Sequence, residues 1–125
     1  MPDARVMLVE ADASMQLWML ELFDELEINL DIVMHGAACV ERVMEAPDAY
    51  DLIVMDINHS EEGEKTGSVD VRREVHLLSS QVPVLAVTDD CAWQDRRRAV
   101  AAGFCGVVVK PVDRDRLTKV ITDLV

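Results

Sequence analysis

The chain has 125 residues, half of them hydrophobic, and its 24 acidic against 12 basic residues give a formal net charge of −12. This length and apolar content favour one folded domain, whose core needs neither disulfides nor a structural metal. The negative charge disfavours nucleic acid and anionic membranes as direct partners, because both repel such a surface. A cation or a basic patch on another protein is the natural counterpart.

The cysteines and the start of the chain indicate a reduced, cytoplasmic protein. Cys39, Cys91 and Cys105 are an odd number without metal-ligand spacing, and each has apolar neighbours, which favours small core residues over reactive thiols. The first five residues carry no basic segment, and no stretch reaches the roughly 18 apolar residues of a membrane span. We therefore expect no signal peptide and no membrane association.

Apolar runs and segments of helical period alternate through the first part of the chain. Residues 5–9 form a short apolar run that predicts a buried strand, followed by Glu10 and Asp12. Residues 13–26 repeat apolar side chains every three or four positions, which predicts a helix capped by Asp12 or Ser14.

A second strand and a second helix follow. The polar alternation of residues 29–34 indicates an edge strand, and residues 36–46, stopped by Pro47, indicate a helix. The inward face of that helix is predicted to consist of Ala37, Val40, Val43 and Met44.

Residues 51–56 form the strand on which the functional argument depends. Four consecutive apolar residues precede Asp56, as in a strand that is buried on both faces of a parallel sheet. Loops converge at the carboxyl end of such a strand and ligands bind there, so Asp56 is a candidate for chemistry. On this segment alone, a strand-terminating or helix-capping role is an equal alternative.

The rest of the chain continues the alternation. Residues 58–67 are polar and twice interrupted by glycine, which predicts a loop. After it we predict a helix at 68–79, a strand at 81–87, a helix at 91–102 ended by Gly103, a strand at 106–109 and a helix at 113–125. The basic run at 96–98 is either a solvated helix face or a partner-docking surface.

Five strands thus alternate with five helices, which requires right-handed crossovers and a parallel sheet between two helical layers. The prediction is a single three-layer α/β domain spanning residues 1–125. In a parallel sheet all carboxyl ends lie on one side. The side chains expected to converge there are Glu10, Asp12, Asp56, Thr88 and Lys110.

These residue types suit phosphoryl chemistry. Carboxylates from two neighbouring strands make an oxygen site for Mg²⁺, Lys110 supplies a positive charge, and the Thr88 hydroxyl can donate a hydrogen bond to an anionic ligand. Phosphoryl transfer needs charge neutralisation and in-line positioning more than covalent help. Asp56 can itself act as the nucleophile and form an acyl phosphate.

Over its whole length the chain resembles the receiver domains of bacterial response regulators, which have the flavodoxin-like (βα)5 fold of the chemotaxis regulators. The resemblance implies the strand order 2-1-3-4-5. It also implies that Asp56, in Leu-Ile-Val-Met-Asp, accepts a phosphoryl group from a histidine kinase or a histidine phosphotransfer protein. Thr88 matches the threonine that ends the fourth strand in the family, and Lys110 matches the lysine of its Lys-Pro pair. The Lys110-Pro111 bond is expected to be cis by the same resemblance.

The resemblance further implies a Mg²⁺ site formed by Glu10, Asp56 and the main-chain carbonyl of Asn58, with Asp12 as a further candidate. Receivers usually have two adjacent acids after the first strand, and here Ala11 takes the second place. A loss of roughly 10- to 100-fold in Mg²⁺ affinity is expected, by comparison with the effect of removing outer-shell support from a metal site.

Two other departures concern the loop and the signal output. The loop after Asn58 is longer than in the family and carries Glu61, Glu62 and Glu64, which are either solvated or supply a replacement ligand. Val107 stands where receivers keep a switching aromatic residue, and Phe104 is expected to be core. The resemblance implies that this aromatic side chain moves in the conformational change that follows phosphorylation.

The leading hypothesis is a stand-alone receiver without an output domain, which catalyses its own phosphorylation and dephosphorylation and signals to a downstream target protein. The alternative is a degenerate receiver that acts as an interaction module independent of phosphate. A metal-dependent phosphatase is a weaker third class, because the acid that it would need two residues after its nucleophile is Asn58 here.

Overall fold

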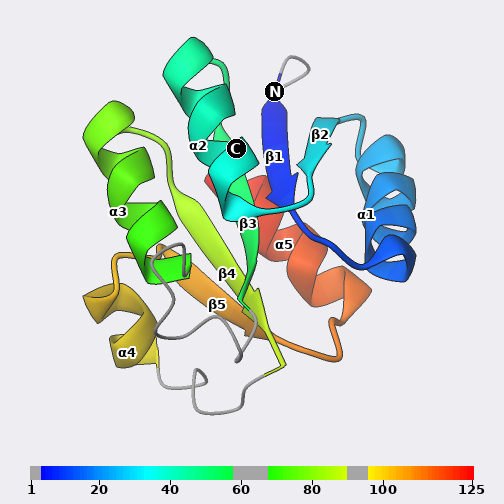
Figure 1. The fold of residues 1–125 in the computed structure, drawn as a ribbon. Coiled ribbons are helices and arrows are strands. Elements are labelled where there is room, and N and C mark those ends of the chain that lie inside the picture. The colour runs from blue at the N-terminus through cyan, green and yellow to red at the C-terminus, as the bar shows by residue number, and fades with distance from the viewer. Residues whose placement is uncertain (1–3, 58–67, 90–95) are drawn as a thin grey trace.

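The structure, a computed structural model, describes residues 4–57, 68–89 and 96–125. Within these ranges strands and helices alternate in chain order (Figure 1). The elements are β1 (Arg5–Val9), α1 (Ala13–Glu25), β2 (Asn29–Val33), α2 (Gly36–Glu45), β3 (Leu52–Ile57), α3 (Ser68–Leu78), β4 (Val84–Thr88), α4 (Arg96–Ala101), β5 (Gly106–Val109) and α5 (Arg114–Leu124).

All neighbouring strands of the sheet run parallel, and their order is β2-β1-β3-β4-β5. This confirms the predicted three-layer α/β fold and its strand order. The apolar strand β3 lies at the centre, and β2, predicted to be an edge strand, is at one edge. Because all carboxyl ends point the same way, the sheet presents a single edge at which the residues after each strand meet.

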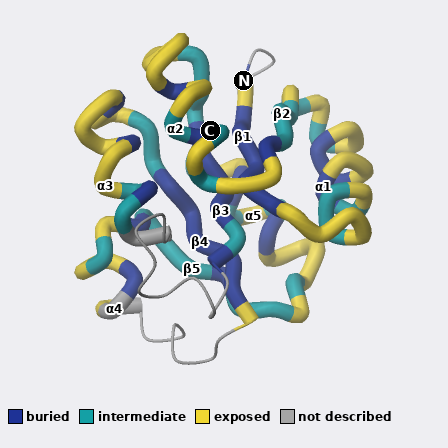
Figure 2. The backbone as a smooth tube through the Cα atoms, viewed as in Figure 1, coloured by how far each residue is buried: buried dark blue, intermediate teal, exposed yellow. Residues whose placement is uncertain are grey.

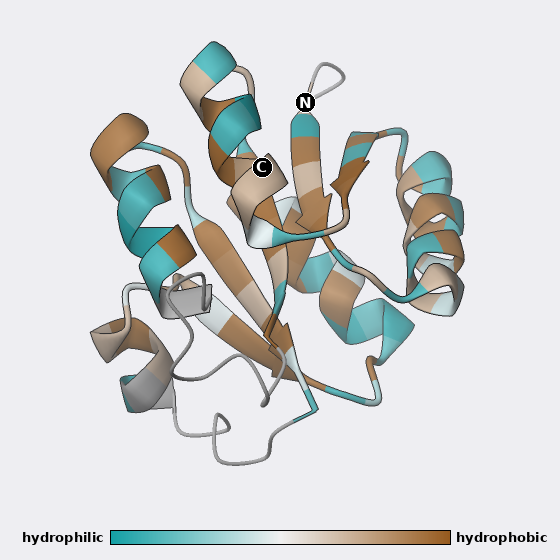
Figure 3. Ribbon diagram, viewed as in Figure 1, coloured by the Kyte–Doolittle hydropathy of each residue, from teal (hydrophilic) through white to brown (hydrophobic). Residues whose placement is uncertain are grey.

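Helices cover both faces of the sheet, α1 and α5 on one and α2, α3 and α4 on the other (Figure 1). Strand side chains alternate between the two faces. Leu8, Val54 and Val108 pack toward α1 and α5, whereas Met7, Met55 and Ala86 pack toward the other three helices. The strands are therefore buried and hydrophobic along most of their length, while the outer helix surfaces are exposed (Figures 2 and 3).

Most element boundaries lie within one or two residues of the prediction, and β4 differs most at its start. It begins at Val84, three residues later than expected. Pro83 has no N–H to donate to a neighbouring strand, although its carbonyl accepts a hydrogen bond from the Ile53 N–H at 3.0 Å. For α4 the structure gives Arg96–Ala101, and the predicted residues 91–95 lie outside the described ranges.

The predicted inward face of α2 is partly wrong. Ala37 is exposed and Met44 is 62% exposed, whereas Cys39 and Val43 are buried against the sheet. Six of the ten residues of this helix are apolar and cover most of its circumference, so the helical period alone does not select the buried stripe.

The two cysteines that the structure describes have the packing role that their neighbours predicted. Cys39 is fully buried, and burial raises the pKa of its thiol to about 12. Burial also raises the pKa of the half-buried Cys105. Neither carries the thiolate that reactivity requires. Cys91 lies outside the described ranges.

No helix within the described ranges is long and apolar enough to span a membrane.

Candidate functional site at the carboxyl edge of the sheet

Three of the predicted side chains are brought to one face of the sheet by strand register and alternation. Val9 pairs with Met55, so the next residues along β1 and β3, Glu10 and Asp56, lie side by side. Asp56 follows Val54 by two residues and Lys110 follows Val108 by two residues, so both belong to the face covered by α1 and α5. Strand geometry alone therefore assembles these three charged groups.

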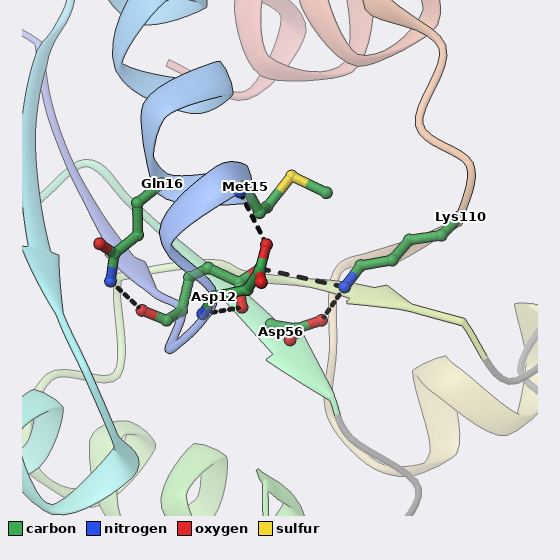
Figure 4. A network of polar contacts seen from close by, with 6 residues as sticks. Asp12, Met15, Gln16, Asp56 and Lys110 are labelled. Atoms are coloured by element: carbon green, nitrogen blue, oxygen red, sulfur yellow. Dashed lines mark hydrogen bonds and ion pairs between the residues drawn. The ribbon is translucent and has the colours of Figure 1, made fainter.

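Asp56 lies within charge-pairing distance of Lys110. The ammonium Nζ of Lys110 is 2.9 Å from Oδ1 of Asp56 and 3.9 Å from Oε1 of Glu10 (Figure 4). The shorter distance would allow a hydrogen bond, but Oδ1 of Asp56 is buried and receives no well-aligned one from the described residues. The contact is thus an ion pair between a lysine and two adjoining carboxyl groups, in a partly dehydrated site where charges interact strongly.

The pKa values reflect this crowding. Burial and the adjoining Asp56 carboxyl raise the pKa of Glu10 to about 7, because ionised Glu10 loses water and meets a like charge. The positive charge of Lys110 works in the opposite direction. Burial alone would lower the pKa of Lys110, but the negative charges of Asp56, Glu10 and Asp89 outweigh it, and the net pKa is raised. Lys110 therefore remains a cation at neutral pH.

The backbone around Glu10 is fixed by hydrogen bonds from α1 and its preceding turn. The Asp12 N–H donates to Oε2 of Glu10 at 3.2 Å, and Nε2 of Gln16 donates to the Glu10 carbonyl at 2.6 Å. Oδ2 of Asp12 accepts from the Met15 N–H at 2.9 Å, which makes Asp12 the N-cap of α1, one of the two predicted caps (Figure 4).

Gln16 is the functional neighbour that the sequence did not reveal. Its contact depends on how the turn after Glu10 folds back, and no spacing rule signals a bond between residues six positions apart. Asp12 is exposed, and one carboxylate oxygen is occupied by the helix cap. Its second oxygen alone is left for any other ligand.

Thr88 ends β4 with no exposed surface, and its carbonyl accepts a hydrogen bond from the Lys110 N–H at 2.7 Å. Alternation along β4 places its side chain with Ala86, toward α4, and not with Asp56. The Lys110-Pro111 peptide bond is cis, as predicted. Thr88 and Lys110 are thereby tied to each other at the ends of neighbouring strands.

Two carboxyl groups and a buried oxygen without an aligned donor are compatible with a hard divalent cation. Among the described residues, no group of three or more His, Cys, Asp or Glu side chains could hold a metal ion. The predicted main-chain ligand, Asn58, lies outside the described ranges, as do Glu61, Glu62 and Glu64 of the predicted loop. Ala11 is exposed at the start of the turn.

The predicted output positions are both resolved. Phe104 is 2% exposed and belongs to the core, as expected. Val107 is half-buried and lines a cavity of about 310 Å³ between β5 and α5. Val107 also packs against the core cluster that contains Ala86, Ala99 and Phe104.

Comparison with known proteins identifies the family. Residues 6–122 match the family model of the response regulator receiver domain. The chain is 27% identical over 121 residues to two-component system protein A of Emericella nidulans, covering 96% of this chain and 17% of that protein. It is 26% identical over 117 residues to transcription factor SKN7 of Chaetomium thermophilum, covering 94% of this chain and 15% of that protein. The chain thus spans less than a fifth of the length of either relative.

Solved structures share the fold. The chemotaxis protein CheY4 of Vibrio cholerae superposes with a TM-score of 0.80 at 19% identity, covering 98% of this chain and 99% of that chain. A chain in the Saccharomyces cerevisiae co-crystal of the histidine phosphotransfer protein Ypd1 with the receiver domain of Ssk1 superposes with a TM-score of 0.78 at 21% identity, covering 98% of this chain and 89% of that chain. With the family match over nearly the whole length, the chain belongs to the response regulator receiver domains of two-component signalling.

Proposed function

We propose that this receiver accepts a phosphoryl group on Asp56 from a phosphohistidine of a histidine kinase or a histidine phosphotransfer protein, and that it then signals by binding a downstream target protein. The observation that carries the proposal is the 2.9 Å ion pair between Lys110 and a buried oxygen of Asp56. The side chain of Asp56 is 19% exposed, which leaves its carboxylate accessible to a phosphoryl donor, and the cation beside it is placed to stabilise the charge of the incoming group.

The step is a transfer between two nucleophiles. An Asp56 oxygen forms a bond to phosphorus while the bond from phosphorus to the donor's imidazole nitrogen breaks, and that nitrogen keeps the electron pair. The transferring group has a loose, negatively charged transition state, so Lys110 contributes by charge stabilisation and not by proton transfer. The later loss of phosphate is hydrolysis of the acyl phosphate.

Mg²⁺ is the proposed cofactor, held by Glu10, Asp56, the main-chain carbonyl of Asn58 and, as a further candidate, Asp12. When bound, it would supply charge neutralisation for the phosphoryl oxygens. Support comes from the adjoining Glu10 and Asp56 carboxyl groups, and burial together with the Asp56 carboxyl raises the pKa of Glu10. Because Ala11 replaces an acid, we keep the expectation of weakened affinity.

The start of α1 suits the docking of a phosphohistidine donor. A cavity of about 310 Å³ adjoins Lys110, lined largely by Met15, Trp18 and Val112, and Leu17 on the outer face of α1 is 60% exposed. A donor helix with apolar side chains can cover this surface while its histidine reaches Asp56. We expect Leu17→Glu to slow transfer from a phosphotransfer protein at least about tenfold, as for an interface anchor. Transfer from a small phosphodonor should be unchanged.

Leu77→Glu on α3 is the matched control, since Leu77 is 78% exposed and distant in sequence from the site. If both variants slow protein-to-protein transfer equally, or neither does, α1 is not the docking surface.

The second candidate is an interaction module that no longer depends on phosphate. It is favoured by Ala11, which stands where receivers usually have a second acid, and no group of three or more His, Cys, Asp or Glu side chains among the described residues could hold a metal ion. The hypotheses that residues 1–125 act without an output domain and in the cytoplasm stay predictions.

The deciding experiment is intact-protein mass spectrometry after incubation with a small phosphodonor and Mg²⁺. The proposal predicts one added phosphoryl group that is absent in Asp56→Asn and present in Asp48→Asn, an exposed acid elsewhere. No adduct on the folded wild-type protein, with no Mg²⁺-dependent change in tryptophan fluorescence, would leave the interaction module as the function.

A further inference from the structure

A second cavity, of about 260 Å³, lies at the opposite end of the sheet from Asp56, where β4 and β5 begin. It is enclosed by α3, the segment that connects α3 to β4, and the turn between α4 and β5. Its polar and small lining residues are Arg72, His76, Ser80, Gln81, Gly103 and Cys105. None of these takes part in the site proposed above.

Arg72 is held in this cavity by its packing against the turn after α4. A Cβ placed on Gly103 would lie 2.1 Å from Cζ of Arg72, so the guanidinium packs directly against the glycine and would have to move to admit a side chain there. Gly103 also has a φ of +94°, a left-handed conformation that glycine adopts readily, and it ends α4 as predicted. The backbone turn and the arginine therefore fit one another.

One N–H group of the guanidinium lacks an acceptor. Nε of Arg72 is buried and has no hydrogen-bond partner among the described residues. An unmade hydrogen bond of a buried charged donor is costly. By contrast, Arg73, the next residue on α3, is 67% exposed and pairs with Asp70. Arg73 is thus paired with an acid, whereas Arg72 lines the cavity and its Nε–H has no acceptor among the described residues.

The chemical character of the lining points to an anion. None of the acids that the structure describes lines this cavity, although acids outnumber bases two to one in the chain. His76 is one helical turn after Arg72 on the same side of α3, and Ser80 and Gln81 add a hydroxyl and an amide. All four side chains can donate hydrogen bonds, and a guanidinium binds oxyanions through two parallel N–H groups.

The volume limits the size of the ligand. A water molecule takes about 30 Å³ of liquid volume, and cavities that bind drug-sized ligands begin at about 300 Å³. At about 260 Å³ the cavity has room for an ion of a few non-hydrogen atoms.

We propose that this cavity binds a small oxyanion, a carboxylate or inorganic phosphate, through the guanidinium of Arg72. The ligand would join α3 to the turn between α4 and β5, two segments that no strand pairing links. The site is independent of phosphorylation, and its test is made in Asp56→Asn protein so that phosphate at the acceptor site does not contribute.

The test is a nuclear magnetic resonance titration of nitrogen-15-labelled protein with sodium phosphate and, separately, sodium acetate, against sodium chloride at equal ionic strength. The side-chain Nε–H signal of Arg72 and the backbone amide signal of Gly103 are followed. The proposal predicts saturable shifts of both signals with phosphate or acetate and none with chloride. The anion that binds more tightly identifies the ligand class.

Arg72→Lys keeps the positive charge but removes the guanidinium, and with it the parallel N–H donors and the Nε–H group. It should weaken binding at least about tenfold, read from the Gly103 amide. Arg73→Lys, the matched control, should leave affinity unchanged. The proposal is overturned if neither oxyanion shifts the Arg72 Nε–H signal of the folded protein beyond the effect of chloride, or if Arg72→Lys binds as tightly as the parent.

Discussion

The site at the carboxyl edge has two parts that differ in how fully they are formed. The acceptor half, which consists of Asp56, Thr88 and Lys110, has a close ion pair, a main-chain hydrogen bond from Lys110 to Thr88 and one fully buried residue, Thr88. The cation half, which consists of Glu10, Ala11 and Asp12, contributes one buried acid, one methyl group and one acid engaged as a helix cap. The two halves share Asp56 but differ at position 11, so we expect a change at Ala11 to alter metal affinity while the ion pair between Lys110 and Asp56 stays in place.

The largest expected effect is in the acceptor half. Lys110→Ala should slow phosphorylation of Asp56 by about a hundred- to a thousandfold, the usual effect of removing one preorganised charge-stabilising group. The rate is measured from adduct formation with a small phosphodonor at saturating Mg²⁺. Lys119→Ala, on the exposed side of α5, should react at the wild-type rate. Equal rates for both variants would show that Lys110 does not stabilise the transferring group.

In the cation half, Ala11→Asp should raise Mg²⁺ affinity by about ten- to a hundredfold, because it restores an acid beside Glu10. Ala11 is exposed, so the added carboxylate meets no packing barrier. Calorimetric titration of wild-type protein, Ala11→Asp and Ala13→Asp separates a local ligand from a general gain in negative charge. Equal affinities for the two variants would contradict a direct role at position 11.

Glu10 predicts how stability depends on pH in the absence of divalent cations. Its folded pKa of about 7 lies above the ordinary value of 4.5, so the folded state binds more protons than the unfolded state between these values. Stability from this group is present below pH 4.5 and is lost as the pH rises through 7. Glu10→Gln should flatten this slope and stabilise the protein at pH 8 by on the order of 2 kcal/mol.

Urea unfolding at pH 5 and pH 8 measures this difference. Glu21→Gln, on the exposed side of α1, should keep the wild-type slope. A wild-type slope in Glu10→Gln would mean that another group accounts for the proton uptake.

The smallest expected effect concerns Thr88. Thr88→Val keeps the shape of a fully buried side chain and removes one hydroxyl. Because that side chain lies on the face of the sheet away from Asp56, phosphorylation should slow by no more than about two- to tenfold, the equivalent of one hydrogen bond. The same adduct assay measures the rate. A decrease in the phosphorylation rate as large as that of Lys110→Ala would show that Thr88 stabilises the charge of the transferring group directly, as Lys110 is proposed to do.

Much of the fold was predictable because four of the five strands are apolar runs bounded by polar residues. In a parallel sheet the carboxyl ends of all strands lie at one edge, so the sequence also predicted that Glu10, Asp56 and Lys110 lie close together. The inward face of α2 was not predictable, because apolar residues surround most of that helix and only its neighbours select Cys39 over Met44.

The finer geometry of the site depends on the path of the turn after Glu10. Asp12 could be assigned to the helix cap or to a metal, and only the structure shows that one oxygen caps α1. The bond from Gln16 to the Glu10 carbonyl has no signature in the sequence, since it requires the turn and the first turn of α1 together. The raised pKa of Glu10 likewise follows from burial that residue type does not reveal.

The most direct test of the central claim, an intact acceptor beside a weakened cation site, is the rate of Asp56 phosphorylation by a small phosphodonor across a wide range of Mg²⁺ concentrations. Peptide mass mapping locates the phosphoryl group. The account predicts a single adduct at Asp56 whose rate rises with Mg²⁺ and approaches saturation only at high concentration, with no adduct in Asp56→Asn. An adduct at another residue, or no adduct at any Mg²⁺ concentration, would contradict it.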